Sequence, residues 1–340
     1  MKIKTELMHL THKHAFTIAR RKASKSGGTT NVKISIEHDG LIGLGEAHPS
    51  PYYYGETIER IIDVAKKAEP ILGTDPFLLE DIIDELYKAF PNAPSAIAGI
   101  DIALYDLVGK MLEIPLYKYF GLNPDKAPAT DFTIGIDTIP VMLKKLKEAS
   151  GYPIYKVKVG VEGDMDMLKA IRDNTDAVIR VDANTGWDVD EAIEKINEME
   201  RYDIELVEQP IPAKNYEGLK KIRQNVNIPI MADEDSVTSD DIPALAGCVD
   251  MINIKLMKCR GLRDALRMIH IGHSFGMKVM LGCMSESSLS LTAAAHLSPL
   301  VEYADLDGNL LITDDPFEGL KQPNGKIVLP NRPGIGAVEK

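Results

Sequence analysis

Ionisable residues recur at the ends of short apolar runs in this 340-residue chain. Such runs are typical of buried parallel strands, which are nearly all apolar, so a charged residue at the end of one needs its own explanation. The residues concerned are Lys158, Asp182, Glu208, Asp233, Lys255, Asp305 and Asp307. The strands of a (β/α)-barrel end at one mouth, where the catalytic groups of such enzymes lie, so these seven groups are expected to share one pocket.

Three of these residues, Asp182, Glu208 and Asp233, are carboxylates that end successive runs. Ionised carboxylates crowd together only when a cation offsets their repulsion. Any one of them could instead cap a helix or pair with a nearby lysine, but this explanation weakens for three at the same register. No histidine occurs between His48 and His270, so an all-oxygen ligand set is expected and Mg²⁺ is the leading candidate.

Two of the lysines, Lys158 and Lys255, end the second and sixth runs and would face each other across a ring of eight strands. A single lysine is more often a solvated surface charge. Near Mg²⁺ and near another ammonium, here that of Lys156, a lysine loses its proton more easily and can act as a general base. Two opposed bases predict racemisation or epimerisation, because one removes a proton and the conjugate acid of the other returns it to the opposite face.

The fold that must position these groups is predicted from the alternation of apolar runs with amphipathic helical segments. Runs of this kind, most followed by a polar loop and a helix, indicate parallel strands with crossover helices. They cover residues 131–136, 154–159, 177–182, 204–208, 228–233, 250–255, 278–282 and 301–307. Eight such units predict an α/β fold, a (β/α)-barrel (modified TIM barrel) over residues 127–314.

The first part of the chain has a different pattern. Two β-rich runs, VKISIEHDG and LIGLGEA, flank a turn at Asp39 and Gly40, and helical periodicity follows over residues 56–67 and 76–110. This order predicts an α+β capping domain over residues 1–126. The tail, residues 315–340, is rich in Pro and Gly and is expected to return to that domain.

Composition limits the class of partner. The net charge of −12 argues against binding of nucleic acid or an anionic membrane, and no apolar run reaches the roughly 18 residues that would span a bilayer. The three cysteines have no CxxC spacing, which disfavours a thiolate zinc site or a disulfide framework. We therefore expect a cytoplasmic protein with a small-molecule ligand. Barrels of this kind often associate, so a homo-oligomer is a further expectation.

The motifs at the strand ends form an ordered set that resembles the muconate lactonizing enzyme subgroup of the enolase superfamily, over essentially the whole chain. They are KVKVG from Lys156, DAN from Asp182, EQP from Glu208, DED from Asp233 and NIKLMK from Asn253. The resemblance implies that Asp182, Glu208 and Asp233 bind Mg²⁺, which stabilises an enediolate. It implies that Lys158 and Lys255 handle the protons of the L and D epimers, with Lys156 as their electrostatic partner.

Two further segments resemble the dipeptide epimerases of this subgroup. In DLDGNLL the resemblance implies that Asp305 and Asp307 hold the free α-ammonium group of a dipeptide, although a turn ending in Gly308 would also explain the pair. GCMSESSLS, from Gly282, resembles the strand-seven segment of the same branch. Thr133, Cys283 and Met284 are expected to contact the substrate as well.

Specificity for the substrate side chain is expected from residues 16–30, a Gly-, Ser- and Thr-rich stretch that suggests a loop over the barrel mouth. By resemblance to the L-Ala-D/L-Glu epimerases, Arg21, or Arg20 if the register slips, would contact a glutamate side chain. A basic cluster on a solvated loop would look the same. L-Ala-L-Glu is therefore the predicted substrate, with hydrophobic or cationic dipeptides as alternatives and Glu286 as a group that could attract a basic side chain.

Four other functions compete with dipeptide epimerisation. The nearest are an N-acylamino acid racemase or an o-succinylbenzoate synthase, which bind no ammonium and would not need Asp305 and Asp307. A Schiff-base aldolase would use one barrel lysine and would be indifferent to EDTA. A non-catalytic binding barrel would need neither Lys158 nor Lys255.

Overall fold

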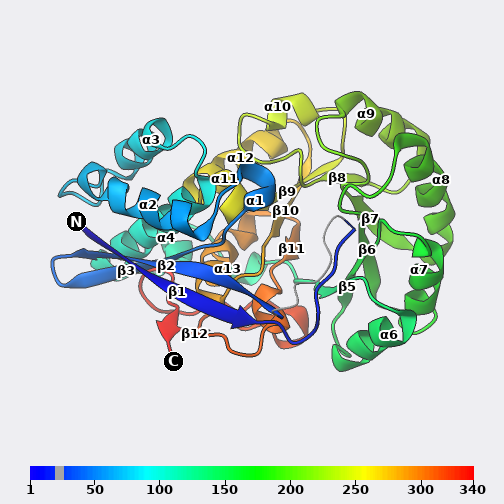
Figure 1. The fold of residues 1–340 in the computed structure, drawn as a ribbon, viewed down its shortest axis with the longest axis horizontal. Coiled ribbons are helices and arrows are strands. Elements are labelled where there is room, and N and C mark those ends of the chain that lie inside the picture. Colours follow the sequence, from blue (N-terminus) through cyan, green and yellow to red (C-terminus); the bar gives the residue numbers. More distant parts are fainter. Residues whose placement is uncertain (20–26) are drawn as a thin grey trace.

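Eight parallel strands form a barrel in the computed structural model, which describes residues 1–19 and 27–340 (Figure 1). Each strand pairs with the next in chain order, and a parallel bridge between Thr130 and Ala304 joins the first strand to the last. The strands are β4 (Phe132–Ile134), β5 (Ile154–Lys158), β6 (Val178–Asp182), β7 (Ile204–Glu208), β8 (Ile230–Ala232), β9 (Met251–Lys255), β10 (Lys278–Gly282) and β11 (Tyr303–Asp305). All eight fall within the predicted runs, so the predicted α/β barrel is confirmed.

Helices connect these strands and cover the outside of the barrel, as α6 to α9 do in Figure 1. They are amphipathic. One example is α8, which begins after Asp188, whose side chain accepts a hydrogen bond from Glu191 N, and which buries Ala192, Ile196 and Met199. The barrel helices are α6 (Ile139–Glu148), α7 (Asp164–Arg172), α8 (Val189–Met199), α9 (Tyr216–Asn225), α10 (Ile242–Leu245), α11 (Leu256–Cys259), α12 (Leu262–Ser274) and α13 (Ser288–Ala295).

The barrel interior changes character along its axis. Below the charged strand ends, a separate apolar cluster of Leu206, Met231, Met251 and Met280 packs against Tyr303. Methionine side chains adapt to irregular space, so they suit the packed interior of a barrel. This packed interior restricts the functional groups to the other end, where the strands finish.

The N-terminal unit is a three-stranded antiparallel sheet, β1 (Lys2–Thr11), β2 (Gly28–His38) and β3 (Leu41–Ala47), covered by helices. Asp39 and Gly40 both have positive φ, 48° and 79°, as a type I′ hairpin turn requires, which confirms the predicted turn. The sequence did not predict β1. Only two of its ten residues are buried, and its sequence accordingly shows little of the alternation of apolar and polar residues that marks a strand.

Helix α4 (Pro94–Met111) joins the sheet to the barrel because nearly all of its residues are buried. It approaches β3 so closely that a Cβ on Gly45 would lie 2.0 Å from the carbonyl oxygen of Gly99. On the barrel side, Arg263 of α12 forms ion pairs with Glu80 and Asp84 of the neighbouring cap helix. The other cap helices are α1 (Pro51–Tyr54), α2 (Ile58–Ala68), α3 (Leu79–Ala89) and α5 (Leu116–Tyr119).

The C-terminal tail forms a small ribbon, β12 (Phe317–Glu318) with β13 (Val338–Glu339), and contacts the N-terminal unit. Lys33 Nζ lies 2.6 Å from a carboxylate oxygen of Glu339, and Asp106 accepts a hydrogen bond from Ile335 N at 2.8 Å. The boundaries at residues 126 and 314 stay predictions. Within the described ranges, no helix is both long and apolar enough to cross a bilayer.

A buried histidine fastens this tail to the barrel and makes stability depend on pH. His296 Nδ1 accepts a hydrogen bond from Tyr117 N at 3.1 Å, and Nε2 lies 2.9 Å from the Ile335 carbonyl oxygen, so the ring is used as a neutral donor and acceptor. Burial lowers its pKa from 6.5 to about 4. The folded protein therefore favours the neutral form of His296. The contribution of this histidine to the free energy of unfolding is complete above pH 6.5 and is lost as the pH falls toward 4.

We expect His296 to account for about 3 kcal/mol of the loss in unfolding free energy between pH 6.5 and pH 4. Urea unfolding of the wild type and of His296→Gln across this range measures it. Glutamine keeps a donor for Ile335 O but does not titrate, so the variant should lose less stability over the interval. Equal losses in the two proteins would contradict the assignment.

Candidate active site

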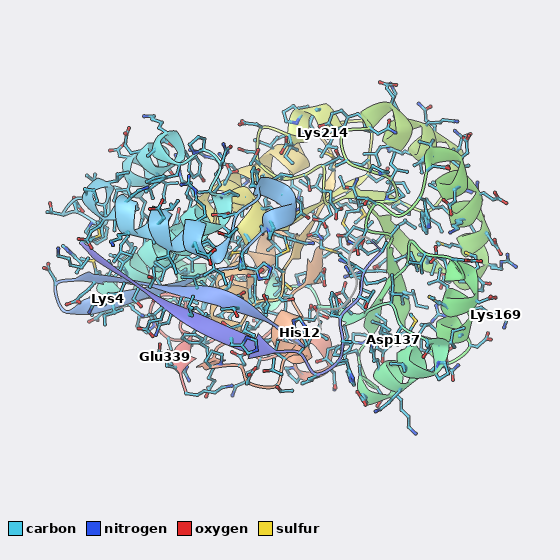
Figure 2. All side chains as sticks on the ribbon, viewed as in Figure 1. Lys4, His12, Asp137, Lys169, Lys214 and Glu339 are labelled. Carbon is cyan, nitrogen blue, oxygen red and sulfur yellow. The ribbon has the colours of Figure 1, made fainter. Side chains whose placement is uncertain are left out.

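The charged residues at the strand ends meet at one level of the barrel. Strand register places Lys158 beside Asp182 and Asp182 beside Glu208, while Gly282 pairs with both Lys255 and Asp305. These charged side chains are all buried. Lysines on the helices behave differently, since Lys169 of α7 points away from the molecule and its side chain is 59% exposed (Figure 2).

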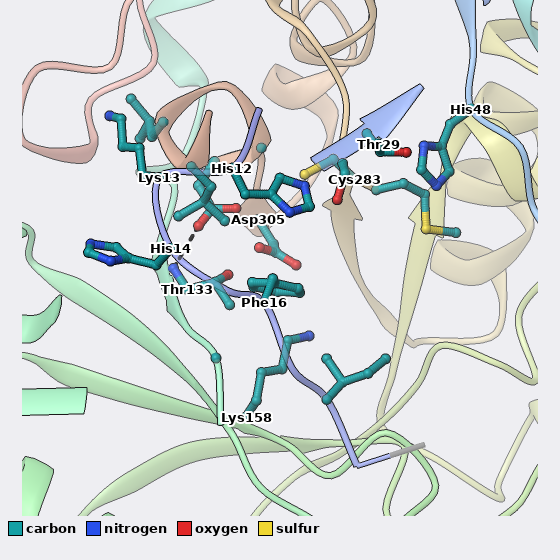
Figure 3. A pocket seen from close by; sticks show the side chains of 18 of the residues that line it. His12, Lys13, His14, Phe16, Thr29, His48, Thr133, Lys158, Cys283 and Asp305 are labelled. Atoms are coloured by element: carbon teal, nitrogen blue, oxygen red, sulfur yellow. Dashed lines mark hydrogen bonds between the residues drawn. The ribbon is translucent and has the colours of Figure 1, made fainter. Parts of the chain in front are cut away.

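Lys158 and Lys255 lie on β5 and β9, four places apart in the ring of eight strands, and therefore on opposite sides of it. Both line a cavity of about 430 Å³, within the range that binds small molecules. Figure 3 shows Lys158, Thr133 and Asp305 around this cavity, with Thr29 and His48 on its other side. The structure thus brings the two predicted bases to one cavity from opposed strands.

Each predicted metal ligand contacts a lysine. Lys158 Nζ lies 2.5 Å from Asp182 Oδ2, and Lys255 Nζ lies 2.8 Å from Asp233 Oδ2. Lys156 Nζ is central, at 2.6 Å from both Glu208 Oε2 and Asp305 Oδ2 and 3.4 Å from Asp182. The site is therefore a buried network of ion pairs, in which each carboxylate has a lysine ammonium beside it.

The pKa of Lys255 moves in the direction opposite to the one expected for a general base. Burial lowers it, but the charges of Asp233, Tyr53 and Glu208 together outweigh burial and raise the pKa above its ordinary value. The ammonium of Lys156 acts in the expected direction with a smaller effect. Burial also disfavours the charge of Lys156, whose pKa Asp305 and Glu208 nevertheless raise. The neighbouring carboxylates therefore favour the charged form of both Lys156 and Lys255.

The donor set suits a hard divalent cation. Asp182, Glu208 and Asp233 offer buried carboxylate oxygens near the ends of three successive strands, and the buried Asn184 Oδ1, beside the cavity, has no hydrogen-bond partner among the described residues. The three carboxylates do not converge as tightly as the sequence suggests. Among the residues described, the trio of acidic groups whose oxygens all lie within 4.8 Å is Asp131, Asp305 and Asp307. The three metal-ligand roles stay predictions.

Asp305, Asp307 and Thr133 line the cavity together. The backbone N–H of Thr133 donates a hydrogen bond to Asp307 Oδ2 at 2.6 Å, so Thr133 orients an aspartate through its main chain. Burial, together with the charge of Asp305, raises the pKa of Asp307 to about 7. A 3₁₀ turn does follow at Gly308, but both aspartates also face the cavity.

Cys283 and Met284 also line the cavity, after the end of β10. Glu286 does not. Its Oε1 accepts a hydrogen bond from Met284 N at 2.6 Å and its other oxygen accepts one from Ser290 Oγ, so the carboxyl group is used within its own segment. The expectation that Glu286 attracts a basic substrate side chain is not supported by its position.

The segment after β1 contributes one wall of the cavity. Phe16 and Ile18 line it, and Thr17 O accepts a hydrogen bond from Ile136 N at 3.0 Å, which holds the segment against the end of β4. Strand β2 begins at Gly28, so the predicted loop over residues 16–30 extends too far by three residues. Arg20 and Arg21 lie outside the described residues.

Several cavity residues were not predicted. His48, just past the end of β3, and Asn184, two residues after Asp182, both line it. The signal for His48 is the same as for the barrel groups, an ionisable residue at the end of a strand, here in the N-terminal sheet. Asn184 stands inside the DAN motif. Phe16 and Ile18 gave no signal, because apolar residues in a loop have many ordinary explanations.

Comparison with known proteins agrees with this geometry. Residues 3–121 match the N-terminal domain of the mandelate racemase/muconate lactonizing enzyme family, and residues 141–338 match the enolase C-terminal domain-like family. An L-Ala-D/L-Glu epimerase from Bacteroides thetaiotaomicron is 44% identical over 329 residues, which cover 96% of this chain and 85% of that protein.

Two solved structures share the whole fold. A dipeptide epimerase from Enterococcus faecalis, complexed with Mg and L-Leu-L-Tyr, is 36% identical with a TM-score of 0.93 and covers 98% of each chain. A dipeptide epimerase from Methylococcus capsulatus, complexed with Mg and L-Arg-D-Lys, is 34% identical with a TM-score of 0.91 and covers 99% of each chain. This chain therefore belongs to the mandelate racemase and muconate lactonizing enzyme family of the enolase superfamily, which confirms the resemblance drawn from its motifs.

Proposed function

We propose that this protein is a Mg²⁺-dependent dipeptide epimerase, an isomerase that inverts the α-carbon of the C-terminal residue of a dipeptide by two-base proton transfer. One observation carries the proposal. Lys158 and Lys255 approach a single cavity from opposed strands, and the same cavity is lined by the carboxylates of Asp305 and Asp307. Similarity to dipeptide epimerases over nearly the whole chain supports it.

The metal would be held by Asp182, Glu208 and Asp233. When bound, Mg²⁺ supplies positive charge beside the substrate carboxylate and the two lysines, which stabilises developing negative charge and favours loss of a lysine proton. Lys156 adds a fixed positive charge. It is fully buried, and three neighbouring carboxylates favour its protonated form.

The two lysines divide the proton transfer. Lys158 would remove the α-proton of the L epimer, and the ammonium of Lys255 would deliver a proton to the opposite face of the same carbon. In the reverse direction the roles exchange. No other pair of opposed bases is needed, and each lysine returns to its starting state after one turnover in each direction.

Asp305 and Asp307 would bind the free α-ammonium of the first residue of the dipeptide. The amide N–H of Thr133 fixes Asp307, while Lys156 fixes Asp305. Anchoring the ammonium at this side of the cavity would leave the α-carbon of the second residue, one peptide unit away, to lie between the lysines, where it would be inverted.

L-Ala-L-Glu is the substrate we assign, supported by the 44% identity to a protein named for that activity. Arg21 is the residue that would contact the glutamate side chain. The solved relatives were crystallised with hydrophobic and cationic dipeptides, so L-Leu-L-Tyr and L-Arg-L-Lys are the alternatives to compare.

Incubation of the protein with Mg²⁺ and each dipeptide in D₂O tests the assignment. We expect deuterium at the α-carbon of the second residue, with formation of the L,D product, fastest for L-Ala-L-Glu. Exchange in another dipeptide but not in L-Ala-L-Glu would reject the substrate and keep the chemistry. Absence of exchange in every dipeptide, with full Mg²⁺ occupancy, would reject the function.

Asp305→Asn distinguishes a dipeptide epimerase from relatives that bind no ammonium. Loss of one full charge from the ammonium site is expected to raise KM for the dipeptide by about tenfold to a hundredfold, since charged hydrogen bonds contribute about 1.5–3 kcal/mol. Steady-state kinetics on the L,L-dipeptide and on its N-acetyl derivative measure this. A KM for the free dipeptide that Asp305→Asn leaves unchanged would favour an N-acylamino acid racemase or o-succinylbenzoate synthase.

We also propose a cytoplasmic location, supported by three cysteines that form no disulfide. Association with further copies of the chain stays a prediction, which sedimentation analysis can measure.

A further inference from the structure

A buried arginine lies behind the proposed ammonium site. Arg180 is on β6, two residues before Asp182, and its side chain lies inside the barrel with 3% exposure. Its Nη1 donates to Asp131 Oδ2 at 2.9 Å and to Ala304 O at 3.1 Å, and its Nε donates to Glu205 at 2.7 Å. These bonds reach the neighbouring strand and the seam where the barrel closes.

Asp131 stands at that seam. It immediately precedes β4, its backbone N–H donates to Ala304 O at 3.2 Å, and its side chain is completely buried. This backbone contact places its carboxyl group beside that of Asp305, the next residue along β11. Oxygens of Asp131, Asp305 and Asp307 all lie within 4.8 Å of one another.

One oxygen of Asp131 has no conventional donor. Arg180 occupies Oδ2, whereas Oδ1 has no hydrogen-bond partner among the described residues. Carboxyl oxygens of Asp131 and Asp305 nevertheless lie within 4.8 Å of each other, and Asp131 acts on Asp305 as a hydrogen-bond partner that lowers its pKa. Two buried carboxylates this close repel each other when both are ionised. The pair is therefore stable only if one carboxyl group is protonated or a cation lies between the two.

The surrounding charges indicate where a proton would reside. Burial raises the pKa of Asp305, but the ammonium of Lys156, 2.6 Å from its Oδ2, and the charge of Lys158 outweigh burial and hold this pKa low. Burial and the charge of Asp305 raise the pKa of Asp131 well above its usual range, and Arg180 and Lys156 offset this only in part. The proton is therefore more stable on Asp131.

We propose that Asp131 is a positioning residue, whose protonated Oδ1 donates a hydrogen bond to the carboxylate of Asp305 while Arg180 fixes its Oδ2. Asp305 is thereby held between two partners, Lys156 and Asp131, and keeps a full negative charge toward the cavity. Without Asp131, Lys156 alone would set the orientation of Asp305. The role in substrate binding rests on the proposed function, in which Asp305 binds the α-ammonium.

Two variants of Asp131 separate this hydrogen bond from a simple charge. In Asp131→Asn, the amide oxygen can accept from Arg180 and the amide N–H can donate to Asp305, so both contacts survive. Asp131→Ala removes both. We expect Asp131→Asn to keep KM for the dipeptide within about threefold of the wild type, and Asp131→Ala to raise KM at least tenfold with a smaller change in kcat. Asp173→Asn, on the surface beside Lys169, is the matched control and should change neither.

The alternatives predict different results. If Asp131 were ionised and bound the ammonium directly, Asp131→Asn would raise KM as strongly as Asp305→Asn, which would overturn the proposal. A second bound Mg²⁺ per chain, measured by equilibrium dialysis and lost in Asp131→Asn, would overturn it in favour of a cation among the three aspartates. The N-acetyl dipeptide, which has no ammonium, should respond little to either variant.

An infrared measurement keeps the proposal testable if Asp131→Ala does not fold or if no dipeptide is turned over. The difference spectrum between the wild type and Asp131→Asn at pH 8 should show loss of one carbonyl band of a protonated carboxyl group. Only carboxylate bands in that difference would refute the protonated state, whatever the activity. Absence of exchange in the wild type, with the protonated band present, would reject the proposed function and leave the proton on Asp131 established.

Discussion

A Lys255→Ala variant is expected to exchange the α-proton of an L,L-dipeptide with solvent deuterium while forming no L,D product. Lys158 remains to remove and return the proton on its own face, but no acid remains on the other face. Lys158→Ala should show the reverse, with exchange starting only from the L,D epimer. Because a positioned acid or base contributes about 10²–10⁴-fold, epimerisation should fall by about 10³-fold or more in both variants.

Neither substitution should destroy the site. Asp233 keeps Lys258, whose Nζ is hydrogen-bonded to it, and Asp182 keeps Lys156 at 3.4 Å, so no carboxylate is left without an ammonium. Exchange is followed by NMR in D₂O and product formation by chiral chromatography, with Lys169→Ala on the exposed face of α7 as the control. Exchange from the same epimer in both variants would show that the lysines do not act on opposite faces.

The barrel and the positions of its functional groups could be predicted because both depend on simple regularities. Buried parallel strands are apolar, side chains alternate between the two faces of a strand, and all eight strands end at the same mouth. A lysine or aspartate on the inward face at the end of a run is therefore expected to point into the barrel mouth. Lys156 and Lys158, two residues apart on β5, point to the same interior for this reason.

Properties that depend on contacts between distant segments could not be predicted. Arg180 is a charge inside a buried strand, and its partner Asp131 lies 49 residues away and becomes its neighbour only when the barrel closes. The direction of a side chain in a turn is equally hard to predict: Glu286 was considered as a group that could attract a basic side chain, whereas the turn after β10 directs it to Met284 and Ser290. The pKa of Lys255 depends on the distance to Asp233, which strand order does not specify.

Glu208→Gln is expected to abolish exchange of both epimers, unlike either lysine variant. Glu208 is the central ligand of the proposed metal site, with Lys156 at one oxygen and Asn253 Nδ2 at 2.8 Å from the other. Glutamine keeps the shape and removes the charge. If a bound cation supplies about 4 kcal/mol of stabilisation to developing negative charge, both exchange rates should fall by roughly 10³-fold.

Removal of metal from the wild type should reproduce this loss and locate its cause. EDTA is expected to stop exchange in both directions, and excess Mg²⁺ to restore it in the wild type but not in Glu208→Gln. Glu217→Gln, on the exposed first turn of α9, should behave as the wild type. Isothermal titration of Mg²⁺ into each protein separates weak binding from slow chemistry. Exchange that persists in EDTA-treated protein shown to contain no metal would exclude the carboxylate site and favour a lysine acting alone, as in Schiff-base chemistry, which borohydride trapping would then detect.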